Sequence, residues 1–314
     1  MTHYIGRRLL HAVPTLVLIS VVVYTILALA PGDPLSQLAA NPDIPPEVRL
    51  NIRHQMGLDQ PVYVRYLKWA TAFAHGNWGY SFQSHVPVDT LVLQRLPTDL
   101  WVVGSSYLVA VLFAIPVGVL SAVKQYSVFD QVATTFAFIG FSLPTFFTGV
   151  LFIIIFSVRL HWLPFIYNVT VTDPTQMLKQ ALMPVAVLAL FNAAGLMRFV
   201  RSSMLDNVQQ DYVRTALAKG LRSARVIVRH VLRNGLIPVV TLLALGLPAV
   251  FTGAVITEQI FRVPGIGSLL IVAMQNSDTP VVMCVVFVYA ILVVLFNIVA
   301  DVLYGLLDPR IRYG

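Results

Sequence analysis

Six long runs of uncharged, mostly apolar residues divide this 314-residue chain and limit what it can fold into. The runs are residues 12–32, 100–123, 131–158, 180–197, 234–257 and 279–300. A helix needs roughly 20 apolar residues, at about 1.5 Å each, to cross a bilayer, and the runs are of about this length. Strands of an outer-membrane barrel would alternate apolar and polar residues over about 10 positions, and these runs do not. The sequence therefore predicts an all-α membrane protein with six transmembrane helices.

The composition agrees with this fold class, because 57% of the residues are hydrophobic and only 11% are charged. We expect one transmembrane domain over residues 1–314, with an outer loop at 31–98 and a cytoplasmic segment at 201–234. The predicted spans are residues 9–30, 100–123, 132–158, 180–200, 235–258 and 280–304. The first run exceeds the roughly 7–15 apolar residues of a signal peptide, so a retained helix is favoured over a cleaved leader.

The basic residues predict the orientation of the chain. With the N-terminus in the cytoplasm, 13 of the 21 Lys and Arg residues fall inside, and five of the other eight lie in the long outer loop. Long loops count for little in the positive-inside rule. Six spans then put both termini in the cytoplasm. The net charge of +7 follows from this topology, so we expect no nucleic-acid partner.

The outer loop contains two predicted short helices, at residues 46–56 and 62–75. The second helix carries aromatic and basic residues, namely Tyr63, Tyr66, Trp69 and Phe73 with Arg65 and Lys68. Such aromatic residues are typical of a membrane–water interface. A surface for a partner protein is the alternative interpretation.

Helix-breaking residues interrupt three of the predicted spans. They are Pro116 and Gly118 in the second span, Ser142 and Pro144 in the third, and Gly246 and Pro248 in the fifth. Broken helices are frequent where spans line a transport pathway, although ordinary packing kinks explain any single break equally well. We predict that Ser142, Pro144, Gly246 and Pro248 belong to a translocation path.

Charged residues are expected only near the ends of the spans, where Asp99, Glu258 and Asp301 fall. A proton-coupled carrier or an intramembrane hydrolase would need polar residues deeper in the membrane, so both classes are disfavoured. The chain has no GxxxxGK[ST] phosphate loop, so it is not expected to hydrolyse ATP itself. The histidines lack metal-ligand spacing, and Cys284 is alone. We therefore expect no metal, cofactor or catalytic residue in this chain.

The stretch from Asp211 to Val239 concentrates basic residues between two apolar runs. Small residues at Ala216, Ala218 and Gly220 favour a sharp turn that another protein surface can approach closely. Downstream, helical spacing predicts an amphipathic helix at 222–233. Its apolar face is Leu221, Ala224, Val228 and Val231, and its basic face is Arg222, Arg225, Arg229 and Arg233. The pattern indicates a docking element, and attraction to anionic membrane lipid also explains the arginines.

Seven motifs follow one another along the whole chain. They are RRLLHAVPTLVLIS with APGDP, GLDQPVYVRYLKW, GNWGYSF, FSLPTFFTG, RSSMLDNVQQDYVRTALAKGL, TGAVITEQIFRVPGIGSLL and DVLYGLLDPRIRYG. In this order they resemble the inner-membrane permease of a bacterial ATP-binding-cassette importer of the dipeptide, oligopeptide and nickel group. The resemblance implies the type I importer permease fold in the bacterial inner membrane, with transport by alternating access.

The resemblance also implies a role for the cytoplasmic segment, as a coupling helix seated in a groove of an ATPase subunit. Importer permeases carry Glu-Ala-Ala, three residues, Gly, nine residues, Ile, any residue and Leu-Pro, and Ala216, Gly220 and Leu232 match this signature. The signature is not matched at Arg214, Thr215, His230 and Arg233. The implied coupling residues are Arg214, Thr215, Ala216, Ala218, Lys219, Gly220, Leu221 and Leu232.

The partners and cargo that the resemblance implies complete the hypothesis. The chain would be one of two homologous permease subunits that form the path, together with two ATPase subunits that bind ATP and Mg²⁺. An external binding protein would deliver di- or oligopeptides to them. Nickel, glutathione or another small solute are the alternative cargoes.

Overall fold

The computed structural model describes residues 2–29, 45–55 and 57–307, and most of them are helical. The α-helices are α1 (Thr2–Leu29), α3 (Pro46–Gln55), α4 (Val62–Ala74), α5 (Val88–Val123), α6 (Val128–Ser142), α7 (Thr145–Phe152), α8 (Pro174–Val208), α9 (Asp211–Ala218), α10 (Ser223–Val226), α11 (Leu232–Phe261), α12 (Ile266–Gln275) and α13 (Thr279–Leu307). Two π-helical segments are η1 (Ile153–Arg159) and η2 (Ile227–Val231). Residues 30–44 of the predicted outer loop, Met56 and the C-terminal residues 308–314 lie outside the described residues.

Five helices among the described residues are long and apolar enough to cross a membrane, and two bent helix pairs bring the number to at most seven. The five are Gly6–Leu29, Val88–Val123, Pro174–Val208, Ser223–Leu243 and Thr279–Val302. The bent pair Val128–Ser142 with Thr145–Arg159 corresponds to the third apolar run. Each of the six runs thus corresponds to helical structure, and the predicted all-α membrane fold is confirmed.

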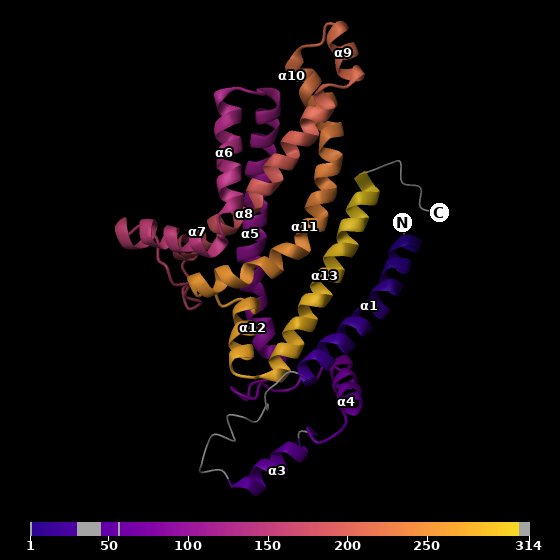
Figure 1. The fold of residues 1–314 in the computed structure, drawn as a ribbon, viewed down its shortest axis with the longest axis vertical. Coiled ribbons are helices and arrows are strands. Elements are labelled where there is room, and N and C mark those ends of the chain that lie inside the picture. Colours follow the sequence, from indigo (N-terminus) through magenta and orange to yellow (C-terminus); the bar gives the residue numbers. More distant parts are fainter. Residues whose placement is uncertain (1, 30–44, 56, 308–314) are drawn as a thin grey trace.

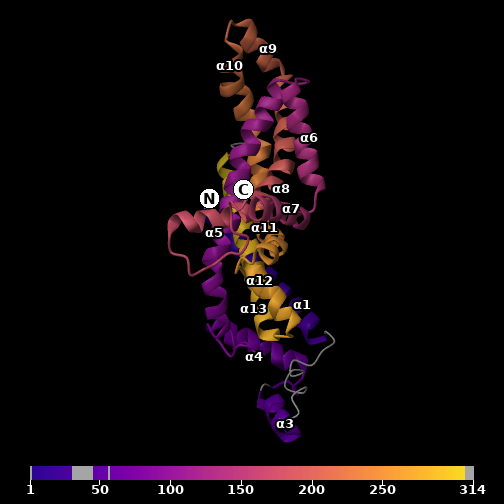
Figure 2. The same ribbon diagram turned by 90° about the vertical axis from the view of Figure 1, so that its left-hand side faces the viewer.

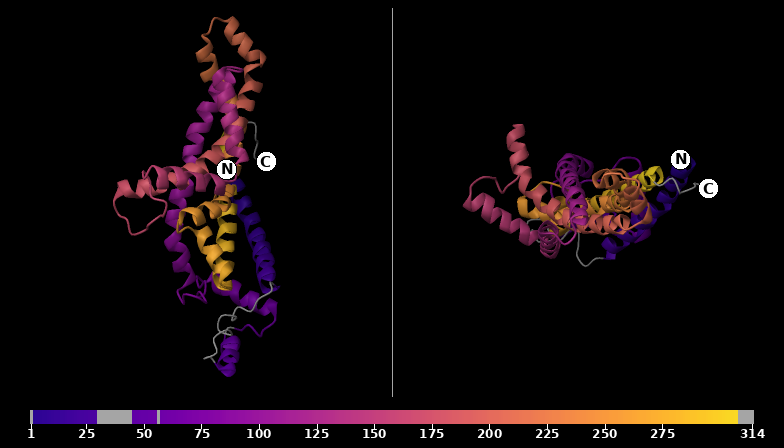
Figure 3. Two further views of the ribbon diagram at one scale, coloured as in Figure 1. Left: turned by 60° about the vertical axis from the view of Figure 1, so that its left-hand side comes forward. Right: turned by 90° about the horizontal axis from the view of Figure 1, so that it is seen from above.

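The third predicted span, residues 132–158, is not one straight helix. The axis turns by 105° between α6 and α7. Pro144 has no N–H to continue the helix, and Leu143 before it is extended, as a residue preceding proline prefers. Figure 3 shows α7 and η1 extending sideways from the other helices.

A second bend follows the fifth predicted span, which continues beyond residue 258 to Phe261. The chain then turns by 81° into α12, an element that the sequence analysis did not predict. Arg262 ends α11 in the left-handed conformation, with φ 54°. Two glycines, Gly265 and Gly267, border the start of α12 against α11. This turn brings α12 against α5, α11 and α13.

The two ends of the molecule carry different short helices (Figures 1 and 2). Helices α9 and α10 lie at one end, and the start of α1 and the end of α13 point toward it. Helices α3 and α4 lie at the opposite end. This arrangement agrees with a cytoplasmic side that holds both termini and with an outer side that holds the long loop.

Most of the aromatic residues of α4 pack within the chain, and the membrane interface and the partner surface suggested by the sequence stay predictions. Tyr66 stacks edge-on against Tyr24 of α1, with ring centroids 5.5 Å apart, and its hydroxyl lies 2.9 Å from Ser20 Oγ. Trp69 and Phe73 both contact the Phe287 ring of α13. Tyr63, in contrast, is 68% exposed. The aromatic residues therefore attach α4 to the membrane helices.

Candidate functional site

Helix α9 lies beyond the ends of α5 and α6, at the end of the molecule farthest from α3 (Figure 1). Its buried residues Val213 and Ala216, 6% and 9% exposed, belong to the same apolar cluster as Val200 and Met204 of α8. An isolated helix of eight residues would be unstable in water. The buried face therefore holds α9 in place on the long helices.

Gly220 ends α9 in a left-handed conformation, with φ 79°. Its N–H donates to the Leu217 carbonyl at 2.9 Å, and the Leu221 N–H donates to the Ala216 carbonyl at 3.3 Å. These two bonds form a Schellman motif, in which glycine is preferred because a Cβ atom raises the energy of this conformation. A Cβ atom at Gly220 would meet nothing within 4 Å. The expected sharp turn is present, and the space beside it is open.

The other face of α9 and the turn are exposed to solvent. The exposed residues are Asp211, Arg214, Thr215, Leu217, Ala218, Lys219 and Gly220, and Arg214 lies 3.7 Å from the Asp211 carboxylate. Leu217 is 45% exposed although it is apolar. The sequence analysis named Ala216 and omitted Leu217, whereas the structure buries Ala216 and exposes Leu217. The three-residue spacing of Val213 and Ala216 was the signal that places both on one helix face.

The eight predicted coupling residues lie at the same end of the molecule but on different sides of it. Leu221 and Leu232 pack against the apolar cluster that also contains Ala216. The other five are exposed. These five, together with Leu217, form a surface that a partner can contact without rearrangement of the described chain.

The amphipathic helix predicted at 222–233 is not a separate element. Helical structure runs from Ser223 through η2 into α11. Val226 and Val231 are buried, 1% and 0% exposed, whereas Val228, which was expected on the apolar face, is 66% exposed. A π-helical turn changes the 3.6-residue period on which the prediction rested. The four predicted arginines are exposed, as expected.

A buried ion pair joins the helices beneath this end. Arg201 of α8 donates two hydrogen bonds to Asp130 of α6, from Nε to Oδ1 at 2.7 Å and from Nη2 to Oδ2 at 2.8 Å. The Ser121 hydroxyl of α5 and the Tyr126 N–H also donate to this carboxylate. Because Asp130 is only 3% exposed, these donors replace the water that it lost. We call this group the inner junction.

The four predicted path residues are not brought together by the structure. Ser142 and Pro144 are exposed at the bend between α6 and α7. Gly246 faces α5, where a Cβ atom would lie 3.4 Å from the Tyr107 hydroxyl. Pro248 lies within α11. Their role in a path remains a prediction.

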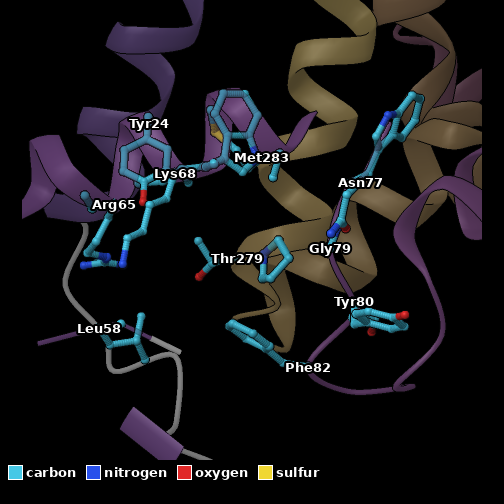
Figure 4. Close-up of a pocket in the computed structure, with 18 of the residues that line it drawn as sticks. Tyr24, Leu58, Arg65, Lys68, Asn77, Gly79, Tyr80, Phe82, Thr279 and Met283 are labelled. Carbon is cyan, nitrogen blue, oxygen red and sulfur yellow. The ribbon is translucent and has the colours of Figure 1, made fainter. Parts of the chain in front are cut away.

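A cavity of about 660 Å³ lies at the outer end, between α1, α4 and the start of α13. Figure 4 shows Arg65 and Lys68 beside Tyr24, with Phe82 and Thr279 across the cavity. The two cations suit a partner with anionic groups. None of the predicted path residues lines this cavity.

Two acidic residues that were expected near span ends are buried side by side. Asp99 lies within the 36-residue helix α5 and is 1% exposed. Glu258 of α11 is 2% exposed. Asp301, the third of these acids, is paired with Arg8 of α1 at 3.1 Å. Their position near span ends stays a prediction, and the sequence did not reveal that Asp99 and Glu258 are buried, since neither sequence position shows that α12 covers them.

Comparison with known proteins identifies the family of the chain. Residues 114–313 match the family described as "Binding-protein-dependent transport system inner membrane component". Residues 1–103 match the N-terminal part of such membrane components. The chain belongs to this family. It is thus an inner-membrane component of a binding-protein-dependent transport system, as the motifs indicated.

Similar proteins extend over the full length of this permease. It is 40% identical over 317 residues to the oligopeptide transport system permease protein AppB of Bacillus subtilis (strain 168), covering 100% of both chains. It is 36% identical over 313 residues to the glutathione transport system permease protein GsiC of Escherichia coli (strain K12), again with 100% coverage of both.

The fold is similar to that of a solved importer. An inward-facing structure of the MetNI methionine ABC transporter matches with a TM-score of 0.55 and 16% sequence identity. The match covers 69% of this permease and 96% of the MetNI chain. This similarity confirms the importer permease fold that the sequence predicted.

Proposed function

We propose that this permease carries di- or oligopeptides inward across the membrane, as one of two permease subunits in an importer driven by two ATPase subunits. The observation that carries the cargo is the 40% identity, over the whole of both chains, to an oligopeptide permease. In this proposal an external binding protein delivers the peptide. ATP and Mg²⁺ bind to the ATPase subunits, and this chain holds no cofactor.

Glutathione is a second candidate cargo, because the chain is also 36% identical over full length to a glutathione permease. Glutathione is itself a small peptide-like solute, so the two candidates share chemistry. A competition assay separates them. Uptake of a labelled dipeptide by cells that express the complete importer should be inhibited by unlabelled di- and tripeptides more strongly than by glutathione, and the reverse order would favour glutathione.

We propose that the exposed face of α9 with the Gly220 turn is the surface that docks with an ATPase subunit. Leu217, 45% exposed, supplies an apolar contact at its centre. Arg214 and Lys219 border it with positive charge. Since a Cβ atom at Gly220 would meet nothing in this chain, a larger side chain there would project into the partner.

Three variants test this surface in the assembled importer. Leu217→Asp and Gly220→Trp should each reduce co-purification of the ATPase subunit at least about tenfold, since a loss of about 1.4 kcal/mol is tenfold in affinity. Gly220→Asn is the matched control, because Asn tolerates the left-handed conformation and adds little bulk. Normal co-purification of Leu217→Asp, with loss of the ATPase on charge reversal at Arg225 and Arg229, would assign docking to the basic face instead.

A further inference from the structure

The buried acids Asp99 and Glu258 meet where α5, α11, α12 and α13 come together, and we call this group the outer junction. Both carboxyl groups border Gly265. Gly265 lies between them, because a Cβ atom there would overlap one oxygen of each acid. Position 265 therefore has no room for a side chain while the two carboxyl groups stay where they are.

Three of the four carboxyl oxygens lack a hydrogen-bond donor among the described residues. Both oxygens of Asp99 and Oε1 of Glu258 are buried and unpaired, whereas Glu258 Oε2 accepts the Ser268 N–H at 2.7 Å. Tyr289 of α13, 8% exposed, has a buried hydroxyl that is also unpaired and faces this pair. A native interior rarely leaves so many polar atoms unsatisfied, which indicates that something binds between them.

The group that binds between the two acids is not a lysine or arginine of the described chain. No Lys or Arg of the described residues forms an ion pair with Asp99 or Glu258. Arg95 of α5 attracts Glu258 but donates to Ser268 Oγ at 3.5 Å. Tyr289 is the titratable group that faces the pair from α13, and α12 contains no ionisable residue. Two carboxylates so placed, away from water, would repel each other strongly.

A metal ion also fits poorly. Within the described ranges, no group of three or more His, Cys, Asp and Glu residues could hold one. Hard cations such as Ca²⁺ take six to eight oxygen ligands, and Ser268 directs an N–H rather than an oxygen at Glu258. A proton, in contrast, needs only the two carboxyl oxygens that already face each other.

We propose that Asp99 and Glu258 form a proton-binding site, in which one shared proton hydrogen-bonds the two carboxyl groups and ties the α11–α12 turn to α5. With the proton bound, the pair carries one negative charge. The positive charge of Arg95 and the hydrogen bond from the Ser268 N–H stabilise it. Loss of the proton leaves two like charges in contact and loosens the junction. The outer half of the helix bundle is then most firmly closed at low pH.

The linkage between this proton and folding gives a definite sign. Ordinary carboxyl groups of an unfolded chain are deprotonated above about pH 5. The folded chain then holds one proton more than the unfolded chain, so stability falls as pH rises until the proton leaves the pair. An amide in place of either acid supplies a permanent hydrogen-bond donor, so this pH-dependent part of the folding stability should disappear.

The test uses the full chain in detergent micelles. Infrared spectroscopy of the wild type at pH 7 should show a protonated carboxyl band that Asp99→Asn and Glu258→Gln each abolish. The melting temperature of the wild type should fall by about 5 °C between pH 5.5 and pH 8.5 relative to either amide variant, for a change of one to two kcal/mol in a chain of this size. Asp278→Asn is the control, because Asp278 is also buried but its carboxylate accepts hydrogen bonds from Ser81 Oγ and the Phe82 N–H.

Either of two results would overturn the proposal. The first is absence of the protonated band from the wild type. The second is a wild type whose melting temperature rises on addition of Na⁺ or Ca²⁺ at constant ionic strength, with the rise lost in Asp99→Asn, which would assign the site to a metal cation. Because the first result is read on the wild type alone, it does not depend on how well the variants fold.

Discussion

The inner and outer junctions solve the same electrostatic problem in opposite ways. At the inner junction, Asp130 is 3% exposed and is matched by the two-pronged contact with Arg201. At the outer junction, Asp99 and Glu258 are 1% and 2% exposed and form no ion pair with a Lys or Arg of the described residues. The inner charge is therefore compensated at every pH at which arginine is charged. The outer pair depends, in our proposal, on a proton from the surroundings.

Because of this difference, the contact between helices is permanent at the inner end and can be broken at the outer end. The inner junction ties α5, α6 and α8 together directly beneath the α9 surface. Such a permanent contact suits the end where we propose that the ATPase subunit docks, because it holds the three helices together when the partner moves. The outer junction joins α5 to the turn between α11 and α12, where the chain has bent by 81°. A breakable contact there leaves that end free to change shape.

The largest effect is expected from Asp130→Ala. Removal of the carboxylate leaves Arg201 without its partner, and the cost should be about 3 kcal/mol, the lower end of the range for breaking a buried pair, because the Arg201 side chain is 23% exposed. The free energy of unfolding, measured in mixed micelles, should fall by this amount at both pH 6 and pH 8. A loss that appeared only at high pH would mean that the inner junction also depends on a proton, and the contrast between the two junctions would fail.

Gly265→Ala probes the outer junction by crowding rather than by charge. The added Cβ atom would overlap oxygens of both Glu258 and Asp99, so we expect a loss of about 1–3 kcal/mol. Gly118→Ala is the matched change near the inner junction, where a Cβ atom would lie 2.8 Å from the Met197 carbonyl oxygen. Its cost should be similar and independent of pH, whereas the cost of Gly265→Ala should decrease as pH rises, because the deprotonated carboxyl groups move apart and make room for the Cβ atom. Equal pH profiles for the two variants would contradict this.

Much of the fold followed from the sequence, because apolar run length is set by the bilayer. The long helices and the turn at Gly220 needed only local information. The bend at Pro144 was visible as a helix breaker, but its 105° angle depends on how α7 packs. Burial of Asp99 could not be foreseen, since it requires α12, which comes more than 160 positions later in the chain. Leu217 was missed because the family signature skips its position.

A smaller effect is expected at Gly220, which lies above the inner junction. Gly220→Ala puts a Cβ atom into the left-handed conformation and should cost about 1–2 kcal/mol of folding stability, although the space around it is open. Gly220→Asn should cost less, because Asn tolerates this conformation. The two unfolding free energies, compared in the isolated permease, show the strain of the turn. Equal stability of all three proteins would mean that the turn relaxes and that Gly220 matters only for the partner.

The smallest effect is expected from Arg8→Gln, which removes an ion pair that water can reach. Arg8 and Asp301 meet at 3.1 Å, but their side chains are 47% and 24% exposed. Water replaces the lost partner, so the change should cost less than about 1 kcal/mol and should shrink further as salt is added. Arg201→Gln is the matched arginine change at the inner junction and should cost several times more, with little dependence on salt, because Asp130 is shielded from both water and ions. Comparable losses for the two arginines would show that burial of the inner pair contributes little, and that the permanent contact beneath α9 must come from apolar packing instead.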